Sequence, residues 1–314
     1  MQIVTDRGMD LSPQQREGIE FHQVPLLIEL DGRTYRSGED IEPGAFYQLL
    51  ANTHSYPTTT QPSPGDFAAL YRRLAADDPD ILSVHISSGL SGTINAARLG
   101  AEMVPEANVT LVDTKTLSGG EGWQVEAAAR ALKAGWPLDA ILELLARIRA
   151  AADTMFTLDE LRYLVHGGRI SHIKGLLAQV LRIRPVIGVE KVLGKYEQLG
   201  QARTFARATQ LLVDQVVARH KPGSPLRLQI MHAYNPEGAA ELRAKLDAVF
   251  ACEWLPISHI APVLGAHTGP SMIGVVFAPQ ALFSELPWWT LSLADLAIAG
   301  PWPKIAPALP ECLP

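Results

Sequence analysis

Short apolar segments separated by helical patterns are the feature that most restricts how this chain folds. Residues 2–5 (QIVT), 80–86 (DILSVHI) and 108–113 (NVTLVD) are candidate strands, and residues 64–75 and 91–103 have helical patterns. Strands that are almost continuously apolar are buried on both faces, which is typical of a parallel sheet between helices. The first half of the chain is therefore predicted to be an α/β domain with a parallel sheet.

A hairpin interrupts this alternation. In residues 25–36 (PLLIELDGRTYR), Asp31-Gly32 separates two apolar runs. An Asp-Gly pair in this position favours a two-residue turn between antiparallel strands.

A second set of elements follows a helical stretch at about 121–152, which is broken at Gly135-Trp136-Pro137. Strands are expected at 184–190, 226–233, 253–258 and 272–278, and helices near 204–220 and 236–250. The pattern predicts a second α/β domain. We place the two domains at residues 1–153 and 154–283, followed by a Pro- and Trp-rich tail at 284–314.

Length and composition agree with two soluble domains. The chain has 314 residues, more than a single domain usually holds, and its net charge of −6 argues against a nucleic-acid partner. Its two cysteines, Cys252 and Cys312, are too few for a disulfide framework and lack zinc-ligand spacing. The charged N-terminus does not resemble a signal peptide, and no apolar run reaches the roughly 18 residues of a membrane span. We expect a cytoplasmic protein without an integral membrane segment.

Three segments rich in hydroxyl groups and glycine are expected to be loops near a ligand: 58–63 (TTTQPS), 85–93 (HISSGLSGT) and 265–271 (GAHTGPS). In the first, hydroxyls compete with the backbone for hydrogen bonds and Pro62 lacks a donor, which disfavours both helix and strand. Such loops at strand ends and helix starts form anion-binding cradles. The alternative is that their Ser and Thr residues are ordinary helix N-caps.

The sequence offers weak support for catalysis. Residues 89–93 (GLSGT) approach a nucleophile elbow, and Ser91 with Asp113 and His267 has the chain order of a hydrolase triad, but Thr93 replaces the final glycine. Several serines on one loop suit hydrogen bonding better than one activated nucleophile. His85, His166 and His172 are interpreted as structural. Neither a complete phosphate-binding loop nor a metal motif is present, so no cofactor or metal is expected.

Seven segments in order resemble the DegV family of bacterial fatty-acid-binding proteins: IVTD, PTTTQPS, ISSGLSGT, VDTKTLSGGEG, LRYLVHGGRIS, RIRPVIGV and GAHTGPSMIG. They extend from about residue 3 to residue 278. The resemblance implies a parallel-sheet N-terminal domain and a second α/β domain with a mixed sheet, with one long-chain fatty acid between them. It also implies a separate partner, a fatty acid kinase related to dihydroxyacetone kinases, whose acyl phosphate product feeds phospholipid synthesis.

The resemblance also assigns residues. The hydroxyl pair is Thr59 and Thr60, the histidine beside the carboxylate is His267, and Arg203 is a possible kinase contact. The full set expected to bind the carboxylate is Thr59, Thr60, Ser87, Ser88, Ser91, Gly92, His267 and Thr268. Arg169 is interpreted as structural. Two residues depart from the family pattern: Arg7 follows "TD", where it either pairs with the carboxylate or points into solvent, and Ser271 replaces a glycine.

A hydroxyl cradle suits this ligand, because a carboxylate accepts several hydrogen bonds while the buried tail supplies most of the affinity. Two alternatives stay open: a lipid-dependent regulatory protein without a kinase partner, and a serine hydrolase.

Overall fold

The first sheet is parallel, as the sequence predicts. The computed structural model describes residues 1–172 and 183–284. The sheet has the order β2-β1-β6-β7, formed by β1 (Gln2–Asp6), β2 (His22–Val24), β6 (Asp80–His85) and β7 (Asn108–Asp113). Alternate residues of these strands serve two faces: Ile3 and Leu82 belong to one core cluster, whereas Val4 and Ile81 belong to another. Both faces are therefore buried, which explains why the strands are almost uniformly apolar.

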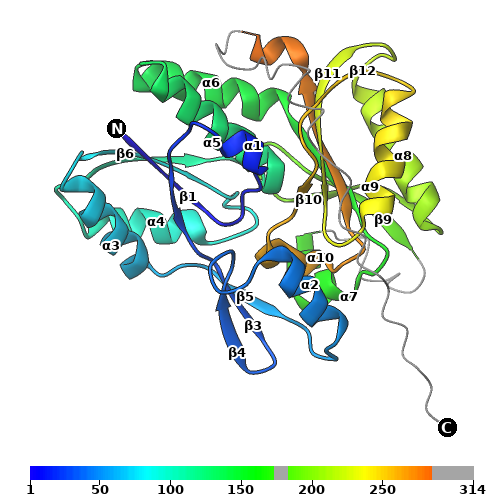
Figure 1. The fold of residues 1–314 in the computed structure, drawn as a ribbon, viewed down its shortest axis with the longest axis horizontal. Coiled ribbons are helices and arrows are strands. Elements are labelled where there is room, and N and C mark those ends of the chain that lie inside the picture. Colours follow the sequence, from blue (N-terminus) through cyan, green and yellow to red (C-terminus); the bar gives the residue numbers. More distant parts are fainter. Residues whose placement is uncertain (173–182, 285–314) are drawn as a thin grey trace.

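Helices cover both faces of this sheet (Figure 1). One face packs on α3 (Pro64–Ala75) and α4 (Thr93–Glu102), and the other packs on α5 (Ser118–Lys133), which α6 (Leu138–Ala151) accompanies. Ser63 caps α3 in a reciprocal capping box with Asp66, so this helix begins where the sequence indicates.

A small antiparallel sheet has the order β4-β3-β5. Its hairpin joins β3 (Leu27–Leu30) to β4 (Arg33–Arg36) through Asp31 and Gly32, whose φ angles are 53° and 73°. Both positive angles are those of the turn that an Asp-Gly pair favours, which confirms the prediction.

The expectation of a loop at 58–63 is wrong for its first half. Residues Thr58–Thr60 form β5, an edge strand that pairs antiparallel with β3. β-branched threonines suit a strand, and Pro62 lies beyond the paired residues, so its missing donor breaks no hydrogen bond of the sheet.

The third sheet is mixed and has the order β10-β9-β8-β14-β11-β12, with β13 paired to β11. Its strands are β8 (Asp153–Thr157), β9 (Arg184–Val189), β10 (Tyr196–Ala202), β11 (Pro225–His232), β12 (Ala251–Trp254), β13 (Ser258–His259) and β14 (Ile273–Pro279). Helices α8 (Phe205–Arg219) and α9 (Pro236–Asp247) pack on one face through Leu212 and Leu242. The other face, including Phe156 and Val276, joins the same core cluster as α5, so the largest core lies between the two halves.

Several elements were not predicted. Residues 190–195 form the turn from β9 into β10, a strand that sequence periodicity missed. The segment 265–271 is not simply a loop, because α10 (Pro262–Thr268) contains its first four residues. The shorter helices are α1 (Pro13–Arg16), α2 (Pro43–Ala51), α7 (Arg162–His166), η1 (Arg169–His172) and η2 (Gln280–Phe283). The predicted tail lies outside the described residues except for Ser284.

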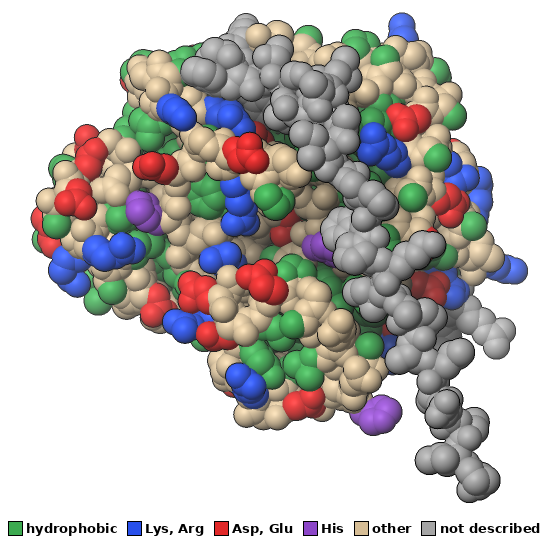
Figure 2. Space-filling model, in the orientation of Figure 1, with side chains coloured by type: hydrophobic (Ala, Val, Ile, Leu, Met, Phe, Trp, Pro, Cys, Tyr) green, Lys and Arg blue, Asp and Glu red, His purple; other side chains and the backbone are tan. Residues whose placement is uncertain are grey.

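On the face drawn in Figure 2, acidic and basic side chains of the described residues are interspersed rather than gathered by sign. No helix within residues 1–172 and 183–284 is long and apolar enough to cross a bilayer.

Candidate functional site

A cavity of about 270 Å³ lies where the small sheet, the loop after β6 and α10 meet. It is bounded by polar residues on one side and apolar residues on the other. The lining residues are Leu26, Thr59, Thr60, Gln61, Ile86, Leu90, Ser91, Leu117, Arg169, Tyr196, Val263, Leu264 and His267. These residues come from both halves of the chain, so the cavity exists only when the halves pack together.

The polar side is built around a contact between Thr59 and His267. Thr59 Oγ1 and His267 Nε2 are 2.6 Å apart, joining β5 to the C-terminal end of α10. Burial, together with the nearby charge of Arg169, lowers the pKa of His267 from 6.5 to about 3, so its imidazole is neutral at pH 7. His267 Nδ1 is buried and has no hydrogen-bond partner among the described residues.

A neutral imidazole carries one proton, and its position decides what Thr59 can do. If Nε2 carries it, the imidazole donates to Thr59 Oγ1, and the threonine hydroxyl is free to donate into the cavity. If Nδ1 carries it, Thr59 must donate to Nε2 instead. Only the first arrangement leaves the Thr59 hydroxyl free to donate to an anion in the cavity.

Arg169 supplies positive charge to the same side. Arg169 is among the lining residues, and its Nη1 donates to the carbonyl oxygen of Gly167 at 2.8 Å. The hydrogen bond to Gly167 agrees with the structural role expected for Arg169, but the place of this residue at the cavity was not foreseen. A single arginine after two glycines carries no sequence signal for a ligand site, because its direction depends on how η1 packs.

The loop after β6 contributes one of its three serines. Ser91 lines the cavity, and its Oγ lies 2.8 Å from Thr93 Oγ1. Ser87 Oγ instead donates to the carbonyl oxygen of Gly194 at 2.8 Å, which ties this loop to the β9–β10 turn. Ser88 is exposed and accepts a hydrogen bond from Lys115 Nζ at 3.1 Å. The structure therefore places Ser91 at the cavity and directs the side chains of Ser87 and Ser88 elsewhere.

Gly92 has a packing role in the cavity wall, where it lies against Gln61. A Cβ atom at Gly92 would lie 2.1 Å from Gln61 Oε1, so the lack of a side chain allows Gln61 to lie in the cavity wall. Gln61 was not among the expected site residues. Thr60 lines the cavity as expected, whereas Thr268 lies deeper, with its hydroxyl donating to the carbonyl oxygen of Leu264 at 3.2 Å.

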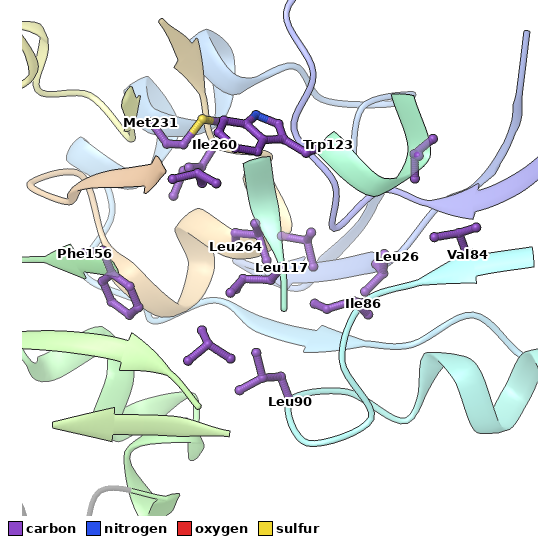
Figure 3. Close-up of a cluster of buried hydrophobic side chains, with 14 of the residues drawn as sticks. Leu26, Val84, Ile86, Leu90, Leu117, Trp123, Phe156, Met231, Ile260 and Leu264 are labelled. Carbon is purple, nitrogen blue, oxygen red and sulfur yellow. The ribbon is translucent and has the colours of Figure 1, made fainter. Parts of the chain in front are cut away.

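The other side of the cavity is apolar. Figure 3 shows Leu117 and Leu264 at the centre of a cluster, with Leu26, Ile86 and Leu90 toward one side and Phe156, Met231 and Ile260 toward the other. Hydrocarbon in this position would be removed from water, which is the main source of affinity for an apolar ligand.

Three residues singled out by the sequence lie away from this lining. Arg203 is exposed, and its carbonyl oxygen accepts a hydrogen bond from Arg184 at 3.2 Å. The Arg7 guanidinium packs against Gly38, where a Cβ would lie 2.8 Å from Nη1, and Arg7 is not among the lining residues. Ser271 Oγ accepts a hydrogen bond from the backbone N–H of Asp159 at 2.9 Å.

The residues that have the chain order of a hydrolase triad, Ser91, Asp113 and His267, do not form a triad in the structure. Asp113 is 2.8 Å from Lys115 Nζ, and His267 contacts Thr59 rather than Ser91. A Ser–His–Asp series does exist elsewhere, since His85 lies 2.7 Å from Ser83 Oγ and 3.0 Å from Asp6 Oδ2. All three side chains of that series are fully buried, so a substrate has no access to them.

Within the described part of the chain, no three His, Cys, Asp or Glu residues form a group that could hold a metal ion. His166 stacks on Tyr56, with ring centroids 4.6 Å apart, and the side chain of His172 lies outside the described residues.

Comparison with known proteins gives consistent matches over most of the chain. A family model described as "Uncharacterised protein, DegV family" matches residues 1–280. A DegV domain-containing protein from Deinococcus radiodurans is 32% identical over 279 residues, covering 89% of this chain and 96% of the relative. A solved DegV family protein from Thermus thermophilus, described as fatty acid binding, is 32% identical, with a TM-score of 0.79 over 88% of this chain and 99% of that chain. DegV from Bacillus subtilis, described as a fatty acid binding protein, is 26% identical, with a TM-score of 0.79 over 89% and 99% of the two chains.

Proposed function

This chain belongs to the DegV family, and we propose that it binds one long-chain fatty acid between its two halves without catalysing a reaction. The observation that carries the proposal is a cavity with hydroxyls, a neutral histidine and one arginine on one side and aliphatic side chains on the other. An amphipathic anion matches both sides. The relatives from Thermus thermophilus and Bacillus subtilis, described as fatty acid binding, support this ligand class.

The carboxylate would lie beside Thr59 and His267. It is ionised at neutral pH and accepts hydrogen bonds, so it favours the imidazole tautomer that donates to Thr59 and frees the threonine hydroxyl to donate to the ligand. Ser91 and Thr60 offer further hydroxyls, and Arg169 offers a compensating charge. Each hydrogen bond to a charged group contributes about 1.5–3 kcal/mol, which is enough to fix the orientation of the bound acid, with its carboxylate at the polar side of the cavity.

The acyl tail would supply most of the binding free energy. At about 0.8 kcal/mol per buried methylene, fourteen or so methylenes contribute on the order of 11 kcal/mol before the cost of association. The aliphatic side of the cavity, including Leu117 and Leu264, is the surface that would cover them.

The experiment that tests this function is mass spectrometry of an organic extract of the purified protein, compared with its Thr59→Val and Thr58→Val variants. Thr58 is the matched control, because it is exposed on the same edge strand and does not line the cavity. We expect stoichiometric fatty acid in the wild type and Thr58→Val proteins and less in Thr59→Val. Equal retention by Thr59→Val would remove this threonine from the site, and an extract without fatty acid would overturn the function.

We further propose that the protein presents its bound acid to a separate dihydroxyacetone-kinase-like fatty acid kinase, which would phosphorylate the carboxylate for phospholipid synthesis. This step rests on the family resemblance, and the exposed Arg203 is the candidate contact. Arg203→Ala is expected to reduce acyl phosphate formation at unchanged lipid content, with the exposed Arg207→Ala as the control. If no such kinase responds to the loaded protein, a lipid-dependent regulatory role becomes the better explanation.

A further inference from the structure

Helix α10 carries three residues of the cavity wall but has no side-chain cap of its own. Val263 and Leu264 lie near its start, and His267 lies near its end. Its N-cap residue is Ala261, whose side chain has no acceptor, and Pro262, which follows, has no N–H to donate. The N–H groups of Ala261 and Val263 therefore need acceptors from outside the helix.

Both acceptors come from the first half of the chain. The N–H of Ala261 donates to Asp10 Oδ1 at 2.8 Å, and the N–H of Val263 donates to Ser37 Oγ at 3.3 Å. The side chains of Asp10 and Ser37 are buried, so water does not compete for these hydrogen bonds. Asp10 lies 251 positions from Ala261 in the sequence. Helix α10 thus belongs to the second half by chain order, but the first half caps its N-terminus.

The first half also contacts the middle and the end of α10. A Cβ atom at Gly265 would lie 2.3 Å from Tyr47 Oη, so the tyrosine packs directly on the backbone of the helix. At the C-terminal end, His267 meets Thr59. With seven residues the helix is only about 10 Å long, so a shift of its N-terminus is transmitted to His267.

Asp10 holds the neighbouring part of the cavity wall as well. Ser118 Oγ donates to Asp10 Oδ2 at 2.6 Å, and the N–H of Asp10 donates to the carbonyl oxygen of Ser118 at 3.2 Å. Ser118 has a φ of 57°, a conformation uncommon for residues other than glycine, and it follows Leu117 of the cavity wall. Figure 3 shows Leu117 and Leu264 together at the centre of the apolar cluster. One carboxyl group therefore joins the segment that carries Leu117 to the helix that carries Leu264.

We propose that Asp10, which does not line the cavity, is a positioning residue for the carboxylate site: with the help of Ser37, it fixes α10 so that His267 stays within hydrogen-bonding distance of Thr59. The inference rests on the proposed fatty-acid function and adds a residue that controls head-group recognition from outside the cavity. Without these caps the N-terminus of α10 is held by packing alone. A displacement of about 1 Å at His267 takes its imidazole beyond hydrogen-bonding distance of Thr59.

The test compares the affinities of delipidated protein for hexadecanoate and for hexadecanol, which has a tail of the same length and no charge. Hydrogen bonds to a charged group are about twice as strong as those between neutral groups, so the acid reports on the head-group contacts more sensitively. We expect Asp10→Ala to weaken binding of the acid about tenfold and of the alcohol less than about twofold. Asp10→Asn should keep both affinities, because its amide accepts from Ala261 through oxygen and donates to Ser118 through nitrogen.

Ser12→Ala is the matched control, because Ser12 is buried on the same segment and its hydroxyl accepts from the N–H of Gln15 at 3.2 Å, which caps α1 rather than α10. We expect this control to lower stability against urea and to leave the ratio of acid to alcohol affinity unchanged. A merely structural role of Asp10 would give the same result for Asp10→Ala.

A second variant decides the question if Asp10→Ala does not fold. Ser37→Ala removes the other cap and is expected to lower the same ratio about threefold, since its hydrogen bond is the longer one. An unchanged ratio in the variants that fold, or a loss in Asp10→Asn equal to that in Asp10→Ala, would overturn the positioning role while leaving fatty acid binding intact. A wild-type protein that binds neither probe would instead overturn the function on which the inference rests.

Discussion

Gly167→Ala is expected to disable the polar end of the cavity through a single added methyl group. The Cβ atom would lie 2.0 Å from His267 Nδ1 and 2.8 Å from Cε1, far inside the distance at which atoms pack. The backbone itself accepts alanine, because φ at Gly167 is −69°. The imidazole must therefore give way.

The direction of that movement follows from the contact on the other side of the ring. His267 Nε2 is already 2.6 Å from Thr59 Oγ1, so the ring cannot shift toward Thr59 and must rotate out of line. A displacement of about 1 Å takes the pair beyond hydrogen-bonding distance. Loss of a buried hydrogen bond destabilises the fold by about 1–3 kcal/mol, and loss of one hydrogen bond to a carboxylate weakens binding about 10- to 100-fold.

Urea unfolding measures the first quantity, and competition by hexadecanoate on delipidated protein measures the second. Gly168→Ala is the neighbouring control: φ there is +75°, so alanine is strained by about 1 kcal/mol, but its Cβ meets no atom within 4 Å. We expect the control to lose stability and keep its affinity. If Gly167→Ala binds as tightly as the wild type, the imidazole does not orient Thr59 toward the ligand, and the reasoning fails.

Three further predictions concern pH and packing. Burial raises the pKa of Asp10 from 3.8 to about 7, so the folded state favours the protonated carboxyl. The contribution of Asp10 to the free energy of unfolding is therefore complete below pH 3.8 and is lost as the pH rises to 7. Asp10→Asn should remove this loss from urea-unfolding curves measured across that pH range. The pKa of His267 is lowered from 6.5 to about 3, so its contribution is present above pH 6.5 and is lost as the pH falls toward 3; His267→Gln should flatten this slope, and an unchanged slope would refute it. Ser87→Ala removes the hydrogen bond to Gly194 and should cost about 1–3 kcal/mol of stability with unchanged fatty acid content; a loss of lipid would instead place Ser87 in the binding site.

The elements that sequence reasoning found have strong local signals. The parallel strands, the Asp31-Gly32 turn and α3 each depend on residues close together in the chain, through apolar periodicity, turn chemistry or an N-cap. The elements it missed depend on partners far away. Thr58–Thr60 become a strand because β3 offers an open edge, and β10 forms against β9 with an irregularity between Gln198 and Gly200 that obscures its alternation.

The features of the candidate site also separate into those with a local sequence signal and those that depend on residues far away in the chain. The sequence alone predicted the three segments that carry Thr59, Ser91 and His267, because runs of glycine and hydroxyl residues are visible locally. It could not separate Ser91 from Ser87, since the direction of each side chain depends on the β9–β10 turn.

The tertiary structure alone decided the rest. The contact between Thr59 and His267 joins residues 208 positions apart, and burial by the packed halves is what keeps that histidine neutral. Arg169 lines the cavity together with Leu117, Tyr196 and Leu264, because separate elements of the chain converge there. Local chemistry in the sequence determined which groups are available for binding, whereas long-range packing determined their direction, their burial and therefore their charge.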